Sequence, residues 1–327
     1  MNHSHWQLIP HQQFCCPAPP ASTRLRQGWH RLLRLLGLGE EAPPERQDPL
    51  PDYRGFDRAP AVAAMDRFFD DWPEPGDGSV WFLLDPPYSG SAAIARDWAR
   101  QRGWARLSPP LATELEAADL PGWWRRQGVS GPWLVDDLAR YLLRTTGGMG
   151  FLRALMVWLL QAKDHGPGLV VCDSWLLGFI DHGLGLAPPR LCRFAPATPG
   201  LLRQLGIRGD DRALARLAAR ARGNVGLALA IQAAEQDSEQ SLPEPPANAD
   251  DLTAFVLHAL LLHRGLLPDE VRQVLPGFAG ERLACCLLRL EQGGLVQQRQ
   301  GRWRVRVFAY PAVREFLAAR DMCLDSD

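Results

Sequence analysis

The sequence of 327 residues contains almost no lysine. Of its 36 basic residues only Lys163 is a lysine, and the others are arginines. A phosphate-binding loop that relies on a lysine side chain is therefore excluded everywhere except around that one position. The formal net charge is −1, so no overall positive field draws the chain to nucleic acid, and any such contact needs a local patch.

Cysteine pairs and long apolar runs are also scarce. The seven cysteines form no C-x-x-C pair, since Cys15-Cys16 and Cys285-Cys286 are adjacent and the others are isolated. The histidines have no metal-ligand spacing either, so we expect no metal. No apolar stretch reaches the roughly 18 residues that cross a membrane, and the first residues lack the form of a signal peptide. We therefore expect a cytoplasmic protein with reduced thiols.

Two stretches rich in proline and charge divide the chain. They cover 40–60 and 236–250, and the second reads QDSEQSLPEPPANAD. Such composition is typical of linkers. The sequence therefore predicts four regions: an N-terminal arm over 1–60, a domain over 61–235, a linker over 236–250 and a C-terminal domain over 251–327.

The central region alternates between strand and helix patterns. Apolar runs that predict strands lie at 80–84, 133–135 and 169–172. Helical patterns surround them at 61–72, 92–101 and 151–162. This alternation predicts an α/β fold with a parallel sheet.

Polar residues follow each of these three strands. The first leads into DPPYSGSA, the second into Asp136-Asp137, and the third into Asp173-Ser174. Ligands bind beyond the carboxyl ends of parallel strands, so these residues form the candidate site.

The loop after the first strand has the outline of a phosphate-binding loop. At the eight positions of G-x-x-x-x-G-K-[ST] the chain reads Asp85-Pro86-Pro87-Tyr88-Ser89-Gly90-Ser91-Ala92. The second glycine is present. The first glycine, the lysine and the hydroxyl residue are replaced by Asp85, Ser91 and Ala92.

In their order and spacing, the loop and the strand ends over roughly 61–234 resemble the AAA+/STAND group of P-loop ATPases. The resemblance implies that Asp136 and Asp137 stand at the Walker B positions, where one carboxylate supports magnesium and the next orients the attacking water. It further implies a polar sensor at Asp173 and Ser174. Arg220 and Arg222 then lie where the helical lid of the family places an arginine toward the phosphates.

The departures from the family pattern predict that the chain hydrolyses no nucleotide. Tyr88 adds bulk where a glycine would let the backbone wrap a phosphate, and Asp85 adds negative charge. Ser91 and Ala92 remove the phosphate-bridging amine and the hydroxyl that ligates magnesium. Two interpretations remain: a plain loop with no cofactor, or weak residual nucleotide binding without hydrolysis. The Asp136-Asp137 pair is then expected only to cap the following helix.

The C-terminal region predicts three helices, two strands and a final helix. The helices are expected at 251–262, in LLPDEVRQVL and in GERLACCLLRLEQGG, the strands in LVQQ and RWRVRVF, and the last helix in PAVREFLAAR. This order resembles a winged helix-turn-helix domain, which often follows the lid in AAA+/STAND proteins.

The predicted wing is rich in arginine. Arg302, Arg304 and Arg306 alternate with apolar residues, so they share one face of a strand, and with Arg299 we expect a patch without a carboxylate. Such a patch suits DNA phosphates, an acidic protein partner, or an ordinary solvated surface.

The N-terminal arm contains a basic amphipathic pattern over 24–36. Its apolar stripe consists of Leu25, Trp29, Leu32, Leu33 and Leu36. A helix of this kind can contact a membrane or enter a groove, but we expect it to pack on its own central domain.

Together these patterns predict a parallel-sheet, P-loop NTPase-like domain with a helical lid, followed by a small winged helix domain. The expected function is that of a catalytically inactive AAA+/STAND-like protein that acts as an interaction or regulatory module with a protein partner. The alternatives are a nucleotide-binding switch and a DNA-binding regulator that uses the wing.

Overall fold

The computed structural model describes residues 5–18, 56–73, 79–161, 165–237, 243–246 and 249–322. The amphipathic pattern at 24–36 and most of the two predicted linkers lie outside these residues. No helix among the described residues is long and apolar enough to cross a membrane.

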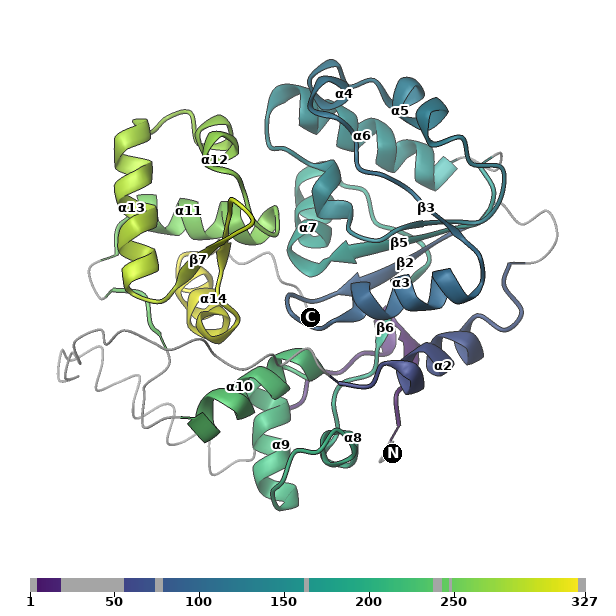
Figure 1. Cartoon of the computed structure of the whole chain (residues 1–327), viewed down its shortest axis with the longest axis vertical. Helices are drawn as coiled ribbons and strands as arrows, with labels where there is room; N and C mark the ends of the chain where they lie inside the picture. Colours follow the sequence, from purple (N-terminus) through teal and green to yellow (C-terminus); the bar gives the residue numbers. More distant parts are fainter. Residues whose placement is uncertain are drawn as a thin grey trace.

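A central sheet organises the described part of the chain (Figure 1). Its strand order is β1-β6-β2-β5-β4-β3. All neighbouring pairs are parallel except β1 with β6. The strands are β1 (Leu8–Pro10), β2 (Val80–Asp85), β3 (Ala105–Arg106), β4 (Trp133–Val135), β5 (Gly168–Asp173) and β6 (Leu191–Phe194). The predicted α/β fold class with a parallel sheet is confirmed.

Helices cover both faces of the sheet, which explains why its strands are continuous apolar runs. On one face Leu83 and Val171 pack with α2 (Ala59–Phe68) and α3 (Ser91–Gln101). On the other face Phe82 packs with α5 (Leu120–Gln127), α6 (Thr146–Gln161) and α7 (Ser174–Phe179). Successive residues of a strand point to opposite faces, so neighbours in β2 enter different cores.

A helical segment follows the last strand of the sheet. It consists of α8 (Pro199–Gln204), α9 (Asp211–Arg220) and α10 (Val225–Asp237). Thr198 and Asp210 cap the first two helices by accepting bonds from Leu201 N and Ala213 N. This segment occupies the place of the predicted lid.

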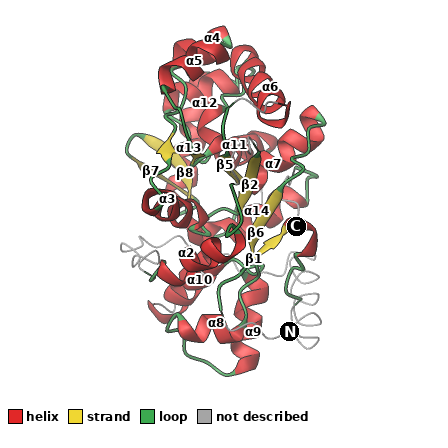
Figure 2. Ribbon diagram, turned by 90° about the vertical axis from the view of Figure 1, so that its right-hand side faces the viewer, coloured by secondary structure: helices red, strands yellow, loops and turns green. Residues whose placement is uncertain are grey.

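The C-terminal region has the predicted order of elements. Its helices are α11 (Asp251–Leu262), α12 (Pro268–Val274), α13 (Gly280–Gln292) and α14 (Tyr310–Ala318), and its strands are β7 (Val296–Arg299) and β8 (Arg302–Val305). β7 and β8 form an antiparallel pair of their own. Figure 2 shows this pair apart from the central sheet.

The predicted separation between the arm over 1–60 and the central domain is wrong for the first described residues. β1 pairs with β6, and exposure alternates from His5 to Leu8 so that Trp6 and Leu8 are buried. Trp6 stacks on Phe56 at 5.7 Å and meets the edge of Phe194 at 5.2 Å. The alternating pattern is only four residues long before Pro10, which is too short to identify a strand from sequence.

We predict that Trp6→Ala lowers the free energy of unfolding by about 3 kcal/mol, because it empties a buried aromatic site. Gln7→Ala is the matched control, since the Gln7 side chain is exposed, and it should change stability by less than about 0.5 kcal/mol. Urea denaturation measures both. Equal stability of the two variants would show that β1 does not belong to the folded core.

Candidate functional site

Three carboxylates meet at the carboxyl edge of the sheet. Asp85 and Asp173 end β2 and β5 and stand opposite one another in the register of the two strands. Asp137 follows the end of β4, the next strand along. The side chains of Asp85 and Asp173 are fully buried. The parallel sheet therefore gathers negative charge at its carboxyl edge, where parallel sheets bind ligands.

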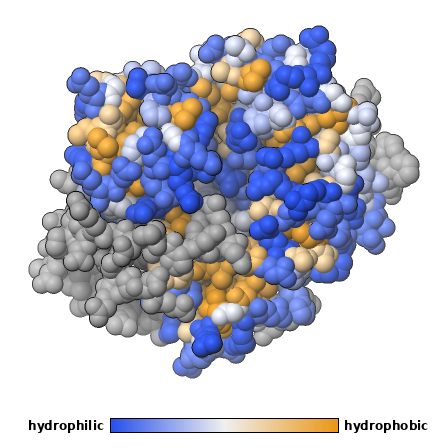
Figure 3. Space-filling model, viewed as in Figure 1, coloured by the Kyte–Doolittle hydropathy of each residue, from blue (hydrophilic) through white to orange (hydrophobic). Residues whose placement is uncertain are grey.

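An arginine from the C-terminal region fills this place. Arg264, which follows α11, directs its Nη1 to Asp85 Oδ2 at 2.6 Å. The same nitrogen lies 3.7 Å from Asp137 Oδ1, and Nε lies 3.7 Å from Asp173 Oδ2. The guanidinium thus forms one close ion pair and two longer contacts. Figure 3 shows a hollow with hydrophilic walls between the C-terminal region at the upper left and the central domain at the upper right.

Burial and charge act in opposite directions on this cluster. Burial alone would lower the pKa of Arg264, but the three carboxylates hold its pKa well above the usual value. Burial raises the pKa of Asp137, and the charges of Asp85 and Asp136 add to that rise, while Arg264 opposes it. Removing one partner from such a cluster leaves an uncompensated buried charge, so its members are strongly interdependent.

The loop that follows β2 bonds to itself. Ser89 Oγ donates to Asp85 Oδ1, and it lies 2.8 Å from Ser91 Oγ. The backbone N–H of Ser91 donates to Ser89 Oγ at 3.1 Å. Gly90 has a φ of 85° and precedes the first turn of α3, as the second glycine of the motif would. The polar groups of this loop therefore already have partners within the protein.

Tyr88 links the loop to the C-terminal region. Its hydroxyl donates to the carbonyl of Val305 at 2.6 Å, and its ring lies 5.4 Å from that of Tyr310. Its φ is 68°, a left-handed conformation that costs a non-glycine residue about 1–2 kcal/mol. Tyr88 therefore occupies a conformation that suits glycine, and its contacts across the interface offset the cost.

The start of α10 covers the same loop. Asn224 donates from Nδ2 to the carbonyl of Pro87 at 2.8 Å, while its Oδ1 accepts from Leu227 N. A side chain at Gly226 would place its Cβ 2.0 Å from the carbonyl oxygen of Tyr88. The helical segment therefore approaches the loop at backbone contact distance, and only glycine permits that approach.

Two polar contacts extend the interface around Arg264. Trp175 Nε1 donates to Tyr310 Oη at 3.2 Å, and the backbone N–H of Arg144 donates to His263 Nε2 at 3.2 Å. His263 Nδ1 lies 2.8 Å from the carbonyl of Ala259, so the neutral ring donates there and accepts from Arg144. Burial lowers the pKa of His263 to about 4, which matches this neutral form.

The predicted capping role of the Asp136-Asp137 pair is wrong. The next element is a 3₁₀-helix over Leu138–Tyr141, and Asp137 makes no side-chain capping bond to it. Asp136 is buried and accepts from Arg96 Nη1 at 3.0 Å and Arg106 Nη2 at 2.7 Å. Asp136 therefore pairs with two arginines of the central domain, whereas its neighbour Asp137 faces Arg264 of the C-terminal region.

Of the predicted sensor residues besides Asp173, Ser174 lies at this edge of the sheet and Arg220 does not. Ser174 is buried beside the cluster, and its Oγ has no hydrogen-bond partner among the described residues. Arg220 does not point to the loop, because it pairs with Glu235 of α10. Arg222 lies in the turn before α10 with a φ of 54°.

Ala92, the last position of the predicted loop, is buried in the first turn of α3.

The predicted wing patch without a carboxylate is also wrong. Arg302 forms a bidentate pair with Glu270 of α12 at 2.8 and 2.9 Å, and it donates to the carbonyl of Gly265. Glu270 also accepts from Leu267 N at the start of that helix. Arg304 and Arg306 are half-buried, and of the four arginines only Arg299 is exposed. A strand pattern cannot reveal a carboxylate that a helix 32 residues away supplies.

The sequence interpretation missed Arg264, Asn224 and Tyr310. Arg264 lies in HRG at the end of α11, with a φ of 53° ahead of Gly265 at 112°. The local pattern indicates a helix end and nothing more. Its partner Asp85 is 179 residues away, and no local signal joins positions at that distance.

Comparison with known proteins adds distant similarities of fold. No family model and no curated protein matches the chain. Among solved structures, Cdc6p from Pyrobaculum aerophilum is 14% identical with a TM-score of 0.32, and the match covers 86% of this chain and 97% of that one. The Aeropyrum pernix ORC1 protein in complex with DNA is 16% identical, with a TM-score of 0.33 and coverage of 83% and 96%.

A Walker-type ATPase of Pyrococcus abyssi is also similar. It is 12% identical with a TM-score of 0.27, and the match covers 82% of this chain and 99% of that one. Each TM-score is below 0.5 and each identity below 25%, so the function of this site is inferred from its own geometry.

We predict that Arg264→Met lowers the free energy of unfolding by about 3–5 kcal/mol, because three carboxylates then face one another without a cation. Arg264→Lys keeps the charge but offers a compact ammonium, so its loss should be intermediate. Arg272→Met is the control, because that arginine pairs with Asp269 at the surface and should lose less than about 0.5 kcal/mol. Urea denaturation followed by tryptophan fluorescence compares them. Equal losses for Arg264→Met and Arg272→Met would contradict the central role of the cluster.

We also predict a stability that falls in acid. The folded pKa of His263 lies below its unfolded value, so its contribution is complete above about pH 6.5 and is lost as the pH falls toward 4. Between these two pH values the contribution of His263 to the free energy of unfolding falls by about 3 kcal/mol. His258 has the same pKa of about 4, and burial also lowers the pKa of His11, so His263→Gln should remove at most about half of the pH dependence in this range. Thermal unfolding between pH 4 and 8 measures it, with the exposed His182→Gln as control. A variant with the wild-type pH profile would contradict the buried neutral ring.

Proposed function

We propose that this chain is an AAA+-like protein whose nucleotide site now holds the C-terminal region against the central domain. In this proposal it acts as a protein-interaction module without nucleotide hydrolysis. The observation that carries this proposal is the position of Arg264. Its guanidinium sits among Asp85, Asp137 and Asp173 at the carboxyl edge of the sheet. In this interpretation the C-terminal region is a winged helix domain that is held in one place by the former site.

The charge of the site opposes nucleotide binding. Phosphoryl transfer depends on positive groups that neutralise the phosphates and position them. Here three carboxylates face one guanidinium, and the position of the loop lysine is held by Ser91, whose N–H is bonded to Ser89 Oγ. A nucleotide would bring further negative charge to an edge that is already acidic. The site is therefore suited to holding a cation.

The alternative of a nucleotide-binding switch requires Arg264 to leave. Its departure would uncover Asp85 and Asp173, both fully buried, and would raise the local negative charge. The Tyr88 hydroxyl would also have to leave Val305. Opening therefore makes the edge less favourable for phosphate, which is the reverse of what a nucleotide-driven switch needs.

The alternative of DNA binding through the wing has lost its main support. Phosphate contact by the wing would use arginines without carboxylates, but Arg302 is neutralised by Glu270. A phosphate contact by Arg302 would first have to break that bidentate pair. Contact with another protein does not depend on this patch. Large apolar side chains are exposed elsewhere, among them Leu288 on α13 and Val157 on α6.

The proposal predicts that the purified chain neither binds nor hydrolyses ATP. Isothermal titration with ATP or ADP, each with Mg²⁺, should give no heat of binding at millimolar concentrations, and phosphate release should stay at background. Arg264→Met should not create binding, because the carboxylates remain. Turnover that disappears in Asp137→Ala would overturn the proposal. Saturable ADP binding without turnover would favour the nucleotide-switch alternative instead.

A further inference from the structure

Two buried histidines lie where α11 meets the central domain. His258 belongs to α11 and His263 follows its last residue, and they are 8% and 5% exposed. The rings of His258 and Trp175 of α7 meet at right angles, with centroids 6.0 Å apart. His263 accepts from the backbone N–H of Arg144, which precedes α6. Both histidines therefore contact the central domain from the C-terminal region.

The bonds of His263 require a neutral ring. Its Nδ1–H donates to the carbonyl of Ala259 at 2.8 Å, which leaves Nε2 as the acceptor for the N–H of Arg144 at 3.2 Å. A protonated ring carries a hydrogen on both nitrogens, so Nε2 would then direct a donor at a donor. Acid therefore breaks the bond that crosses the interface, whereas the bond to Ala259 within the C-terminal region can remain.

The charges around the two rings favour the neutral form as well. Arg144 acts on both rings, and Arg302 of β8 also acts on His263. Glu270 of α12 is held by Arg302 in its bidentate pair. Burial together with the positive charges lowers the pKa of each histidine to about 4, and among the described residues no carboxylate opposes this. Protonation would thus gather positive charges in one buried place.

The carboxylates of the Arg264 cluster respond in the opposite direction. Burial raises the pKa of Asp137 while the C-terminal region is in place, so acid stabilises the closed interface through this group. Arg264 lies 3.7 Å from Asp137 and limits that rise. Asp85 and Asp173 face the same guanidinium. Two histidines therefore act against one aspartate when the pH falls.

The central domain has a core that does not depend on this interface. In the hydrophobic core between the sheet and α5, α6 and α7, Leu262 is the only buried residue from the C-terminal region among those described. Several contacts across the interface are polar, such as Arg264 with Asp85 and Tyr88 with Val305. Water can replace polar contacts at a small net cost, because the freed groups bond to it instead. The interface can therefore open without the loss of that core.

We propose that His258 and His263 form an acid-sensitive latch, so that a fall in pH releases the C-terminal region from the sheet while the central domain stays folded. On release each ring enters water and regains its ordinary pKa of about 6.5. Between pH 7.5 and pH 5 the equilibrium constant for opening then rises about thirtyfold for each histidine. The effect is absent above the ordinary pKa and grows as the pH falls toward 4.

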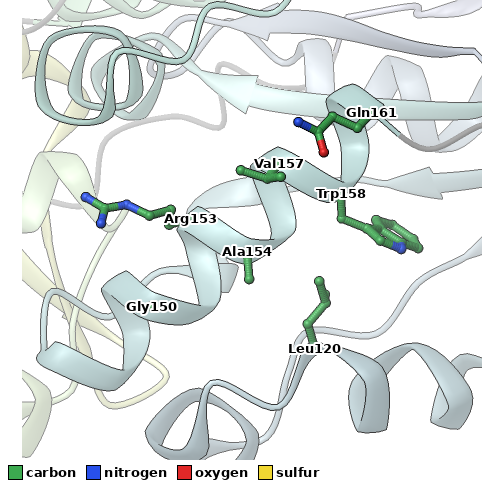
Figure 4. Close-up of a pocket in the computed structure, with 7 residues that line it drawn as sticks. All are labelled: Leu120, Gly150, Arg153, Ala154, Val157, Trp158 and Gln161. Atoms are coloured by element: carbon green, nitrogen blue, oxygen red, sulfur yellow. The ribbon is translucent and has the colours of Figure 1, made fainter.

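Energy transfer between two dyes on the full chain measures this opening. The dyes are attached through p-azidophenylalanine at Val157 of α6 and at Leu288 of α13, both of which are exposed. Val157 projects from α6 on the side away from Leu120 (Figure 4). Far-UV circular dichroism of the same samples measures helix content between pH 7.5 and pH 4.5. We expect the transfer efficiency to fall at a higher pH than the helix signal.

Glutamine at the two positions tests the cause. Its amide donates and accepts as the neutral ring does, but it does not titrate. Each single variant, His258→Gln or His263→Gln, should reduce the pH-dependent rise in the opening constant about thirtyfold, and the double variant should abolish it. Asp137→Asn should enlarge the rise, because it removes the opposing group. His182→Gln, at an exposed position, is the control and should match the wild type.

Two results would overturn the proposal. One is a transfer efficiency that stays constant until the helix signal is lost, since the chain would then unfold as one unit. The other is a wild-type rise in the opening constant in both single variants. The measurements use no nucleotide, so this proposal and the proposed function fail separately.

Discussion

The structure depends on one electrostatic constraint, which is that buried carboxylates at the edge of a parallel sheet need a cation. Asp85 and Asp173 end adjacent strands and have no access to water, and Asp137 lies beside them. In a working P-loop protein this edge receives a nucleotide with its metal. Here Arg264 supplies the positive charge from within the chain. The constraint ties the C-terminal region to the sheet, because the fully buried Asp85 needs the charge of Arg264.

Other contacts at this edge join the same parts of the chain. The Tyr88 hydroxyl donates to Val305 of β8, and Trp175 donates to Tyr310. His263, the neighbour of Arg264, accepts from the backbone of Arg144. The loop over 85–92 is thus held by contacts within itself, from the start of α10 and from the C-terminal region.

Much of the fold follows from local patterns. The runs VWFLL, WLV and LVVC predict strands because a parallel sheet covered on both faces requires continuous apolar residues. The strand over 133–135 and the helix over 251–262 have the predicted bounds. Asp85, Asp136, Asp137, Asp173 and Ser174 could be placed at one edge because parallel strands end on the same side. Strand β1 could not be predicted, since its pairing partner lies more than 180 residues away.

The sequence alone determined that Ser91 and Ala92 stand at the loop positions of the lysine and the hydroxyl residue, so this loop offers no amine. Tertiary structure decided what replaced it. Whether Asp137 caps a helix or faces an arginine, and whether Arg302 is free or bound to Glu270, depends on which distant segment arrives beside it. Charged groups act on whatever lies within a few ångströms. Those distances are set by the packing of whole domains, which local patterns along the chain do not contain.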